Sequence, residues 1–179
     1  MKLNKGIWTY YVLSIFLIAL DQVSKLFVKG FNLLGIHWEG LNLGDSINIL
    51  GETVQLTFIE NEGIASYFLV YYLNKIHYYS KYLKLGVAFI LAGAVGNLID
   101  RVFYGVFYGE ASLFYGKVVD FVRVDIPDLN LFGLNYTHWP IFNVADACIT
   151  IGVVILVIFN KHIPPFSEVF KKGGNINND

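Results

Sequence analysis

Long apolar stretches constrain this chain more than any other feature of its sequence. They cover about residues 7–28, 83–104 and 144–160, and each approaches the roughly 20 apolar residues that an α-helix needs to cross a bilayer. The composition agrees, since 55% of the residues are hydrophobic and only 15% are charged, against about a quarter in a soluble domain. We therefore predict an integral membrane protein built on membrane-spanning helices.

Positive charges near the two ends of the chain predict its topology. Lys2 and Lys5 precede the first apolar stretch, and Lys161 and Lys171 follow the last one. Because lysine and arginine concentrate in cytoplasmic segments, we expect both termini in the cytoplasm, which requires an even number of crossings. The remaining crossing falls at about residues 64–80, where the apolar run is short. We predict four transmembrane helices, the second one short or incomplete.

Two segments lie outside the membrane in this layout. The segment at about 31–60 contains the alternating run 52–59, which predicts a strand bounded by turns. The segment at about 105–142 is rich in glycine and in aromatic residues suited to the headgroup level. The predicted fold is thus all-α with a small extracytoplasmic β-element. It forms one membrane-embedded domain over residues 1–172, followed by a polar tail at 173–179.

Charged and amide side chains gather at the ends of the predicted helices. Such groups are costly inside a membrane, so each is a candidate for function. With four crossings they all arrive at the outer membrane surface. They are Asp21 and Lys25 in the first helix, Asn97, Asp100 and Arg101 in the third, Asp120 in the segment that follows, and Asn143 and Asp146 at the start of the last helix.

Asp120 and Asp146 are the carboxylates of this cluster to which we assign no ion-pair partner, and we expect them to meet near the membrane boundary, where water is scarce. Two carboxylates a few ångströms apart do not both ionise easily, so the pair shares a proton. One member then acts as general base on a water while the other protonates the departing group, which is the chemistry of aspartic peptidases. Asn97, Arg101 and Asn143 would supply orienting hydrogen bonds.

Other interpretations of the same residues stay open. Asp146 also suits a helix cap, and Asp21 with Lys25 and Asp100 with Arg101 suit structural ion pairs. A rival function is a non-enzymatic membrane carrier or proton conductor that uses the same carboxylates. We expect no metal, because the histidines lack ligand-type spacing, and no nucleic-acid partner, because the net charge is −1.

Five blocks of the sequence, in order, resemble characteristic blocks of the lipoprotein signal peptidase family, also called signal peptidase II. The resemblance implies a four-helix enzyme of the bacterial inner membrane, with its active site near the extracytoplasmic face. Its substrate would be a diacylglyceryl-modified prolipoprotein, cut on the N-terminal side of the modified cysteine. The resemblance also implies no cofactor and inhibition by globomycin-type peptides, and we expect a monomer surrounded by membrane lipids. The blocks are Asp21–Lys25, Asn61–Ala65, Gly93–Arg101, Val118–Phe121 and Phe142–Asp146.

The resemblance also assigns roles to individual residues. It makes Asp120 and Asp146 the catalytic dyad. Other positions would line the site, hold the dyad and bind substrate, namely Asn97, Arg101, Asn143 and Ala145. Asp21 and Lys25 would support the architecture and the substrate end, and Asn61 would support the adjacent β-element.

The chain departs from the family pattern in its connections. The segment between Arg101 and Asp120 is longer than usual and aromatic, as an extra flap over the site would be. Ser66 stands where the family usually has a phenylalanine. The stretch from Gly63 to Asn97 is short for the two spans that the family places there.

Overall fold

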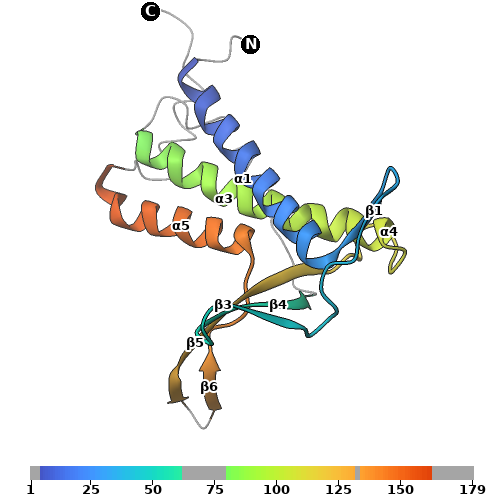
Figure 1. Cartoon of the computed structure of the whole chain (residues 1–179). Coiled ribbons are helices and arrows are strands. Elements are labelled where there is room, and N and C mark those ends of the chain that lie inside the picture. Colours follow the sequence, from blue (N-terminus) through green and yellow to red (C-terminus); the bar gives the residue numbers. More distant parts are fainter. Residues whose placement is uncertain (1–4, 62–79, 132–133, 163–179) are drawn as a thin grey trace, which may run out of the picture.

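The computed structural model describes residues 5–61, 80–131 and 134–162, which form long helices on one side and antiparallel β-structure on the other (Figure 1). The helices are α1 (Lys5–Lys29), α3 (Lys81–Ile99), the short α4 (Gly105–Phe107) and α5 (Val144–Ile158). A π-helical turn at Asp100–Tyr104 joins α3 to α4, and a 3-10 turn at Asn160–His162 follows α5. The strands are β1 (Phe31–Leu33), β2 (Ile36–Trp38), β3 (Ser46–Leu50), β4 (Val54–Asn61), β5 (Val118–Leu131) and β6 (Leu134–His138).

Helices lie over the three long apolar stretches of the sequence. Within the described ranges, Gly6–Lys29 and Lys81–Phe107 are long and apolar enough to cross a membrane, and Val144–Ile158 is apolar but shorter. The second predicted span, at about 64–80, falls almost entirely outside the described residues. The structure therefore supplies three apolar helices around which a membrane domain can form.

The expectation of an all-α fold is wrong, because the β-structure is far more than a small element. Strands β3, β4, β5 and β6 form one antiparallel sheet in that order, and β1 and β2 form a separate hairpin. The sequence pattern predicted only the strand that became β4. The longest strand, β5, contains Pro127 and lies in a glycine-rich and aromatic segment, which is why local signals favoured a loop. Its pairing with β4, between residues distant in the sequence, stabilises it as a strand.

Glycines allow α3 and α5 to pack closely. A Cβ atom on Gly152 would lie 2.6 Å from the carbonyl oxygen of Gly86 and 2.6 Å from Cγ1 of Ile90. Likewise, a Cβ atom on Gly93 would collide with the carbonyl oxygen of Ala145 at the start of α5. The close helix contact sets where α5 begins relative to the end of α3.

The segment before α5 is tied to β5. The amides of Phe121 and Val122 both donate to the carbonyl oxygen of Phe142, and the amide of Phe142 donates back to Val122 at 3.1 Å. A buried apolar cluster lies at the same junction between helix ends and sheet, made of Val28, Phe58, Tyr104, Val119 and Phe121. These contacts bring Asp120 on β5 next to the N-terminus of α5.

Replacing Gly152 with alanine should destabilise the helix packing. The new methyl group meets the backbone of Gly86 as well as the Ile90 side chain, and the backbone contact cannot be relieved by a change of rotamer. Such overpacking costs about 1–3 kcal/mol. Each kcal/mol lowers the melting temperature by roughly 2–4 °C in a chain of this size. Thermal unfolding in detergent measures the shift. Val153→Ala is the matched control, since Val153 is exposed on the neighbouring position. Equal melting temperatures for the two variants would contradict this account of the packing.

Candidate active site

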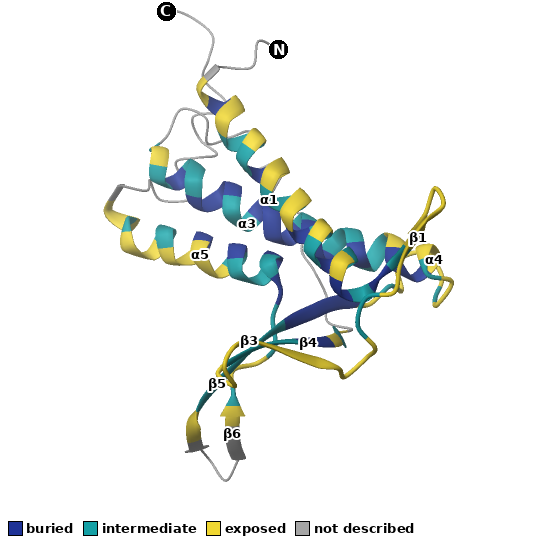
Figure 2. Ribbon diagram, viewed as in Figure 1, coloured by how far each residue is buried: buried dark blue, intermediate teal, exposed yellow. Residues whose placement is uncertain are grey.

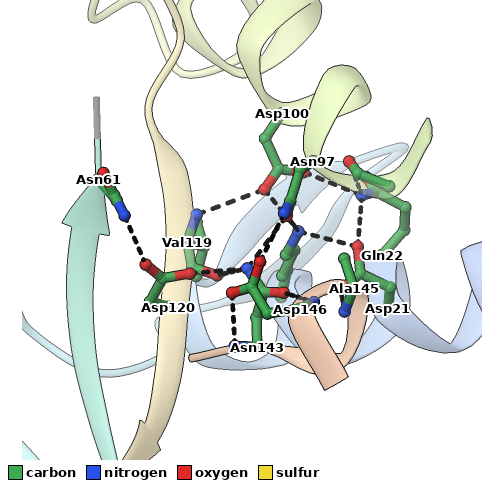
Figure 3. A network of polar contacts seen from close by, with 12 residues as sticks. Asp21, Gln22, Asn61, Asn97, Asp100, Val119, Asp120, Asn143, Ala145 and Asp146 are labelled. Carbon is green, nitrogen blue, oxygen red and sulfur yellow. Dashed lines mark hydrogen bonds and ion pairs between the residues drawn. The ribbon is translucent and has the colours of Figure 1, made fainter. Parts of the chain in front are cut away.

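Asp120 lies in β5 with its carboxyl group buried (Figure 3). The side-chain amide of Asn143 donates to Oδ1 of Asp120 at 2.7 Å, and that of Asn61 donates to Oδ2 at 3.3 Å. Burial and, to a smaller extent, the nearby charge of Asp146 raise the pKa of Asp120 to about 6, against the lowering effect of both amides and Lys25. Asp120 can therefore hold a proton at a pH where an exposed aspartate is fully ionised.

Asp146 lies in the first turn of α5, in a different environment. Its Oδ2 accepts a hydrogen bond from the backbone amide of Asn143 at 3.2 Å, and its own backbone amide donates to Oδ1 of Asn143 at 2.9 Å. These reciprocal bonds form a capping box. Asn97 adds a third contact, because its Nδ2 donates to Oδ1 of Asp146 at 2.8 Å. The carboxyl group of Asp146 thus accepts two hydrogen bonds at the N-terminus of α5.

Asn143 connects the two aspartates. It is fully buried, and its Nδ2 lies 2.7 Å from Asp120 Oδ1, 3.1 Å from Asn97 Oδ1 and 3.2 Å from the carbonyl oxygen of Val119. The same residue caps α5 through Asp146. One residue thus holds both carboxyl groups, Asp120 through its side chain and Asp146 through its backbone amide. The helix-cap interpretation of Asp146 is correct. The two aspartates of the predicted dyad also share one hydrogen-bond partner, Asn143.

Lys25 forms the centre of a buried charged network behind this pair. Its ammonium group is fully buried and lies 2.8 Å from Asp21, 2.8 Å from Asp100 and 2.9 Å from Oδ1 of Asn97. The three ammonium hydrogens therefore have three acceptors. Because Lys25 and Asn143 both bind Oδ1 of Asn97, the other end of this amide, Nδ2, is directed toward Asp146.

The two carboxylates of this network hold neighbouring backbone in place. Oδ1 of Asp21 accepts from the backbone amide of Ala145 at 2.8 Å, and Oδ2 of Asp100 accepts from that of Val119 at 3.3 Å. These bonds anchor the residues next to Asp146 and Asp120. The pair of Asp21 with Lys25 was predicted, whereas Asp100 receives Lys25 as its partner instead of the expected Arg101.

Arg101 lies in the π-helical turn at the end of α3, a kind of irregularity often found at functional sites. Its Nε is buried and has no hydrogen-bond partner in the described part of the chain. The charges of Asp100, Asp120 and Asp146 all act on it. Arg101 therefore adds a positive charge near the two aspartates.

Gln22 is a site residue that the sequence reasoning did not single out. Its Nε2 lies 3.1 Å from Oδ2 of Asp21, 2.9 Å from Oδ1 of Asp100 and 3.1 Å from the carbonyl oxygen of Gly96. It links α1 to the end of α3. The sequence signal that could have identified Gln22 is its polar side chain within an apolar helix, next to Asp21.

The arrangement suits acid–base chemistry on a bound substrate. All nine residues predicted for the site fall within the described ranges, and direct contacts join eight of them, from Asn61 on β4 to Ala145 on α5. Arg101 lies within electrostatic reach of the aspartates. The described residues contain no cluster of three histidine, cysteine, aspartate or glutamate side chains placed to hold a metal ion.

Comparisons with known proteins agree on one family. The family model described as signal peptidase (SPase) II matches residues 13–160, a range that contains the whole site. A lipoprotein signal peptidase of Chlorobaculum tepidum is 36% identical over 173 residues, covering 86% of this chain and 94% of that protein.

Two solved structures share the fold, and both are described as bacterial membrane enzymes. One has a TM-score of 0.56 and 24% identity, covering 96% of this chain and 93% of its own. The other has a TM-score of 0.57 and 26% identity, covering 89% of this chain and 97% of its own. The similarity therefore extends over nearly the whole length of both structures.

Replacing Lys25 with methionine should strongly destabilise the protein. The substitution leaves the carboxylates of Asp21 and Asp100 buried without their cation, and breaking a buried ion pair on one side costs about 3–5 kcal/mol. Lys117→Met is the control, because Lys117 is 46% exposed and lies 3.6 Å from Glu60, and exposed pairs contribute at most about 1 kcal/mol. Thermal unfolding in detergent compares the two. Adding Asp100→Asn to Lys25→Met should restore part of the loss, and no recovery would contradict the network described above.

Proposed function

Because this chain belongs to the signal peptidase II family of aspartic peptidases, we propose that Asp120 and Asp146 hydrolyse the signal-peptide bond of its prolipoprotein substrate. The carrying observation is that Asn143 binds both carboxyl groups while their surroundings differ. A buried strand carries one, and a helix N-terminus carries the other. Such a difference separates the two roles that acid–base hydrolysis requires.

The environments suggest which aspartate takes which role. Asp120, with its pKa raised to about 6, holds the shared proton. Asp146, whose carboxyl group at the N-terminus of α5 accepts hydrogen bonds from two amides, takes the role of the base. Asp146 then removes a proton from the attacking water, and Asp120 donates its proton to the departing amine. The guanidinium group of Arg101, on which the charges of both aspartates act, binds a carbonyl of the substrate near the scissile bond.

The position of the site supports cleavage at the outer surface of the membrane. Asp21 and Asp100 lie toward the ends of α1 and α3, and Asp146 lies at the start of α5. These ends meet where the helices join the sheet (Figure 1). With both chain termini on the cytoplasmic side, this junction faces the extracytoplasmic side of the inner membrane. A diacylglyceryl prolipoprotein, anchored in that leaflet, would present the bond before its modified cysteine there.

The same site bears on inhibition, on the oligomeric state and on the alternative function. A peptide of the globomycin type would block cleavage by occupying the substrate position beside the dyad. Every proposed site residue comes from one chain, so a monomer suffices for activity. The carrier alternative is not favoured, because the carboxylates gather at one end of the helices instead of forming a path along them.

Neutralising either aspartate should abolish cleavage. Asp120→Asn removes the proton donor and Asp146→Asn removes the base, and each role contributes at least about 10²-fold to the rate. Release of the signal peptide from a diacylglyceryl prolipoprotein by purified enzyme measures the effect. Asp125→Asn is the control, since Asp125 is on the same strand, partly exposed and paired with Arg123.

The dyad assignment fails if either variant cleaves at the wild-type rate. A wild-type protein that releases no signal peptide but carries protons into liposomes would instead support the carrier.

The rate of cleavage should fall as the pH rises through about 6. Because burial raises the pKa of Asp120 to about 6, its carboxyl group is protonated below that pH and loses the proton above it. In Asn61→Ala the hydrogen bond that favours the charged form of Asp120 is absent. The pKa of Asp120 therefore rises, and the fall in cleavage rate moves to higher pH. The pH profile of kcat/KM measures both effects.

Gln55→Ala on the same strand serves as control for this profile, because Gln55 contacts Asn48 and not the dyad. If kcat/KM falls at the same pH in Asn61→Ala as in the wild type, Asp120 is not the group that titrates.

A further inference from the structure

The β1–β2 hairpin is unusually apolar for a surface turn. Leu34 at its tip is 94% exposed, and Leu33, Ile36 and Trp38 are also largely exposed. Leu33 pairs with Ile36, so Leu34 and Gly35 form a two-residue turn in which both have positive φ. Asn-Gly usually occupies such turns, because positive φ is costly for other side chains. A leucine at this tip indicates that the apolar side chain itself is useful.

The hairpin is held against the end of the first membrane helix. The ring of Trp38 packs on that of Phe27 with centroids 4.6 Å apart, and Trp38 Nε1 donates to the carbonyl oxygen of Phe27 at 2.8 Å. At its base, the amide of Leu41 donates to the carbonyl oxygen of Val28 at 2.7 Å. The hairpin projects beside α4 and away from the β3–β6 sheet (Figure 1).

A pocket of about 400 Å³ lies between the hairpin and α1. Apolar side chains form most of its wall, and His37 is its one ionisable residue. The lining includes Val23, Leu26, Phe27, Leu33, Ile36 and Trp38. An apolar pocket of this size fits a hydrocarbon chain.

The pocket opens on the outward face of α1. Val23 and Phe27 are exposed, and with Phe16 and Leu20 they form an exposed apolar stripe along the helix (Figure 2). Asp21 and Lys25 are buried on the other side of α1, because residues two apart in a helix lie about 200° around its axis. The pocket therefore faces away from the two aspartates.

Ion pairs mark the polar boundary next to the hairpin. Lys29, the last residue of α1, pairs with Glu60 and, at 2.8 Å, with Glu110. The hairpin starts two residues later. Leu33 and Ile36 of the hairpin line the same pocket as Val23 and Phe27 of the stripe on α1, so the apolar hairpin adjoins the side of α1 that a bilayer would cover.

We propose that the β1–β2 hairpin inserts into the outer leaflet of the membrane, and that an acyl chain of a bulk phospholipid fills the pocket between it and α1. The occupant is bulk lipid and not substrate, since the pocket and the dyad lie on opposite faces of α1. The hairpin then acts as a second anchor that sets the depth of the site below the membrane surface. This inference is independent of which residues cleave the substrate.

A spin label at the hairpin tip tests the insertion. Leu34→Cys is labelled in a Cys148→Ala background, in protein reconstituted in phosphatidylethanolamine–phosphatidylglycerol vesicles. We expect relaxation by lipid-soluble oxygen and protection from a water-soluble nickel chelate, as for a label at the lipid-facing Phe16→Cys. A label at Glu52→Cys, in the exposed turn between β3 and β4, should show the opposite. A tip label that behaves like the one at position 52, or that neither reagent reaches, overturns the proposal in favour of water or of a protein contact.

Trp38 reports on the pocket without any change to the hairpin. In a Trp8→Phe, Trp139→Phe variant the remaining emission comes from Trp38. Phospholipids brominated along their acyl chains should quench most of this emission, and acrylamide in the water should quench little. The reverse pattern would exclude an acyl chain in the pocket. Signal-peptide release is measured on the same sample. Because cleavage tests the dyad and quenching tests the lipid proposal, the failure of one is distinguished from the failure of the other.

Discussion

The buried ammonium group of Lys25 is the constraint on which the rest of the site depends. A charge removed from water is tolerated only with close partners that satisfy every hydrogen, and here those partners come from α1 and α3. Two of them, Asp21 and Asp100, also accept backbone amides from α5 and β5. Helices and sheet cannot shift independently without leaving a buried charge unsatisfied. The network thereby fixes the backbone on which the two aspartates stand.

The polar network also gives the two aspartates unequal surroundings. Asn143 begins α5 and needs a side-chain partner for its cap, which Asp146 supplies. The same asparagine donates a hydrogen bond to Asp120 on β5. A structural requirement, the helix cap, therefore produces the chemical asymmetry of the pair. In the mechanism that we propose, the position that caps the helix also places Asp146 for catalysis.

The helices and the candidate residues could be predicted from sequence, whereas the sheet and the charge pairing could not. Apolar length alone indicated α1 and α3, and polar residues within apolar stretches indicated the site. Strand β5 depends on pairing with β4, which local patterns do not contain. Asp100 was assigned to its neighbour Arg101, but its partner Lys25 comes from another helix. The resemblance to a family selected Asp120 and Asp146 as the dyad, and that assignment stays a prediction.

Depth relative to the membrane surface decides whether such a pair can work. Hydrolysis needs water, so a pair far inside the bilayer would lack its second reactant. A pair in open water would lose the burial that raises the pKa of Asp120. The apolar cluster of Val28, Phe58, Tyr104, Val119 and Phe121 joins the helix ends to the sheet beside the site. In the arrangement that we propose, the sheet lies in water and the apolar hairpin in lipid, and the site would then lie at the boundary, where both conditions are met.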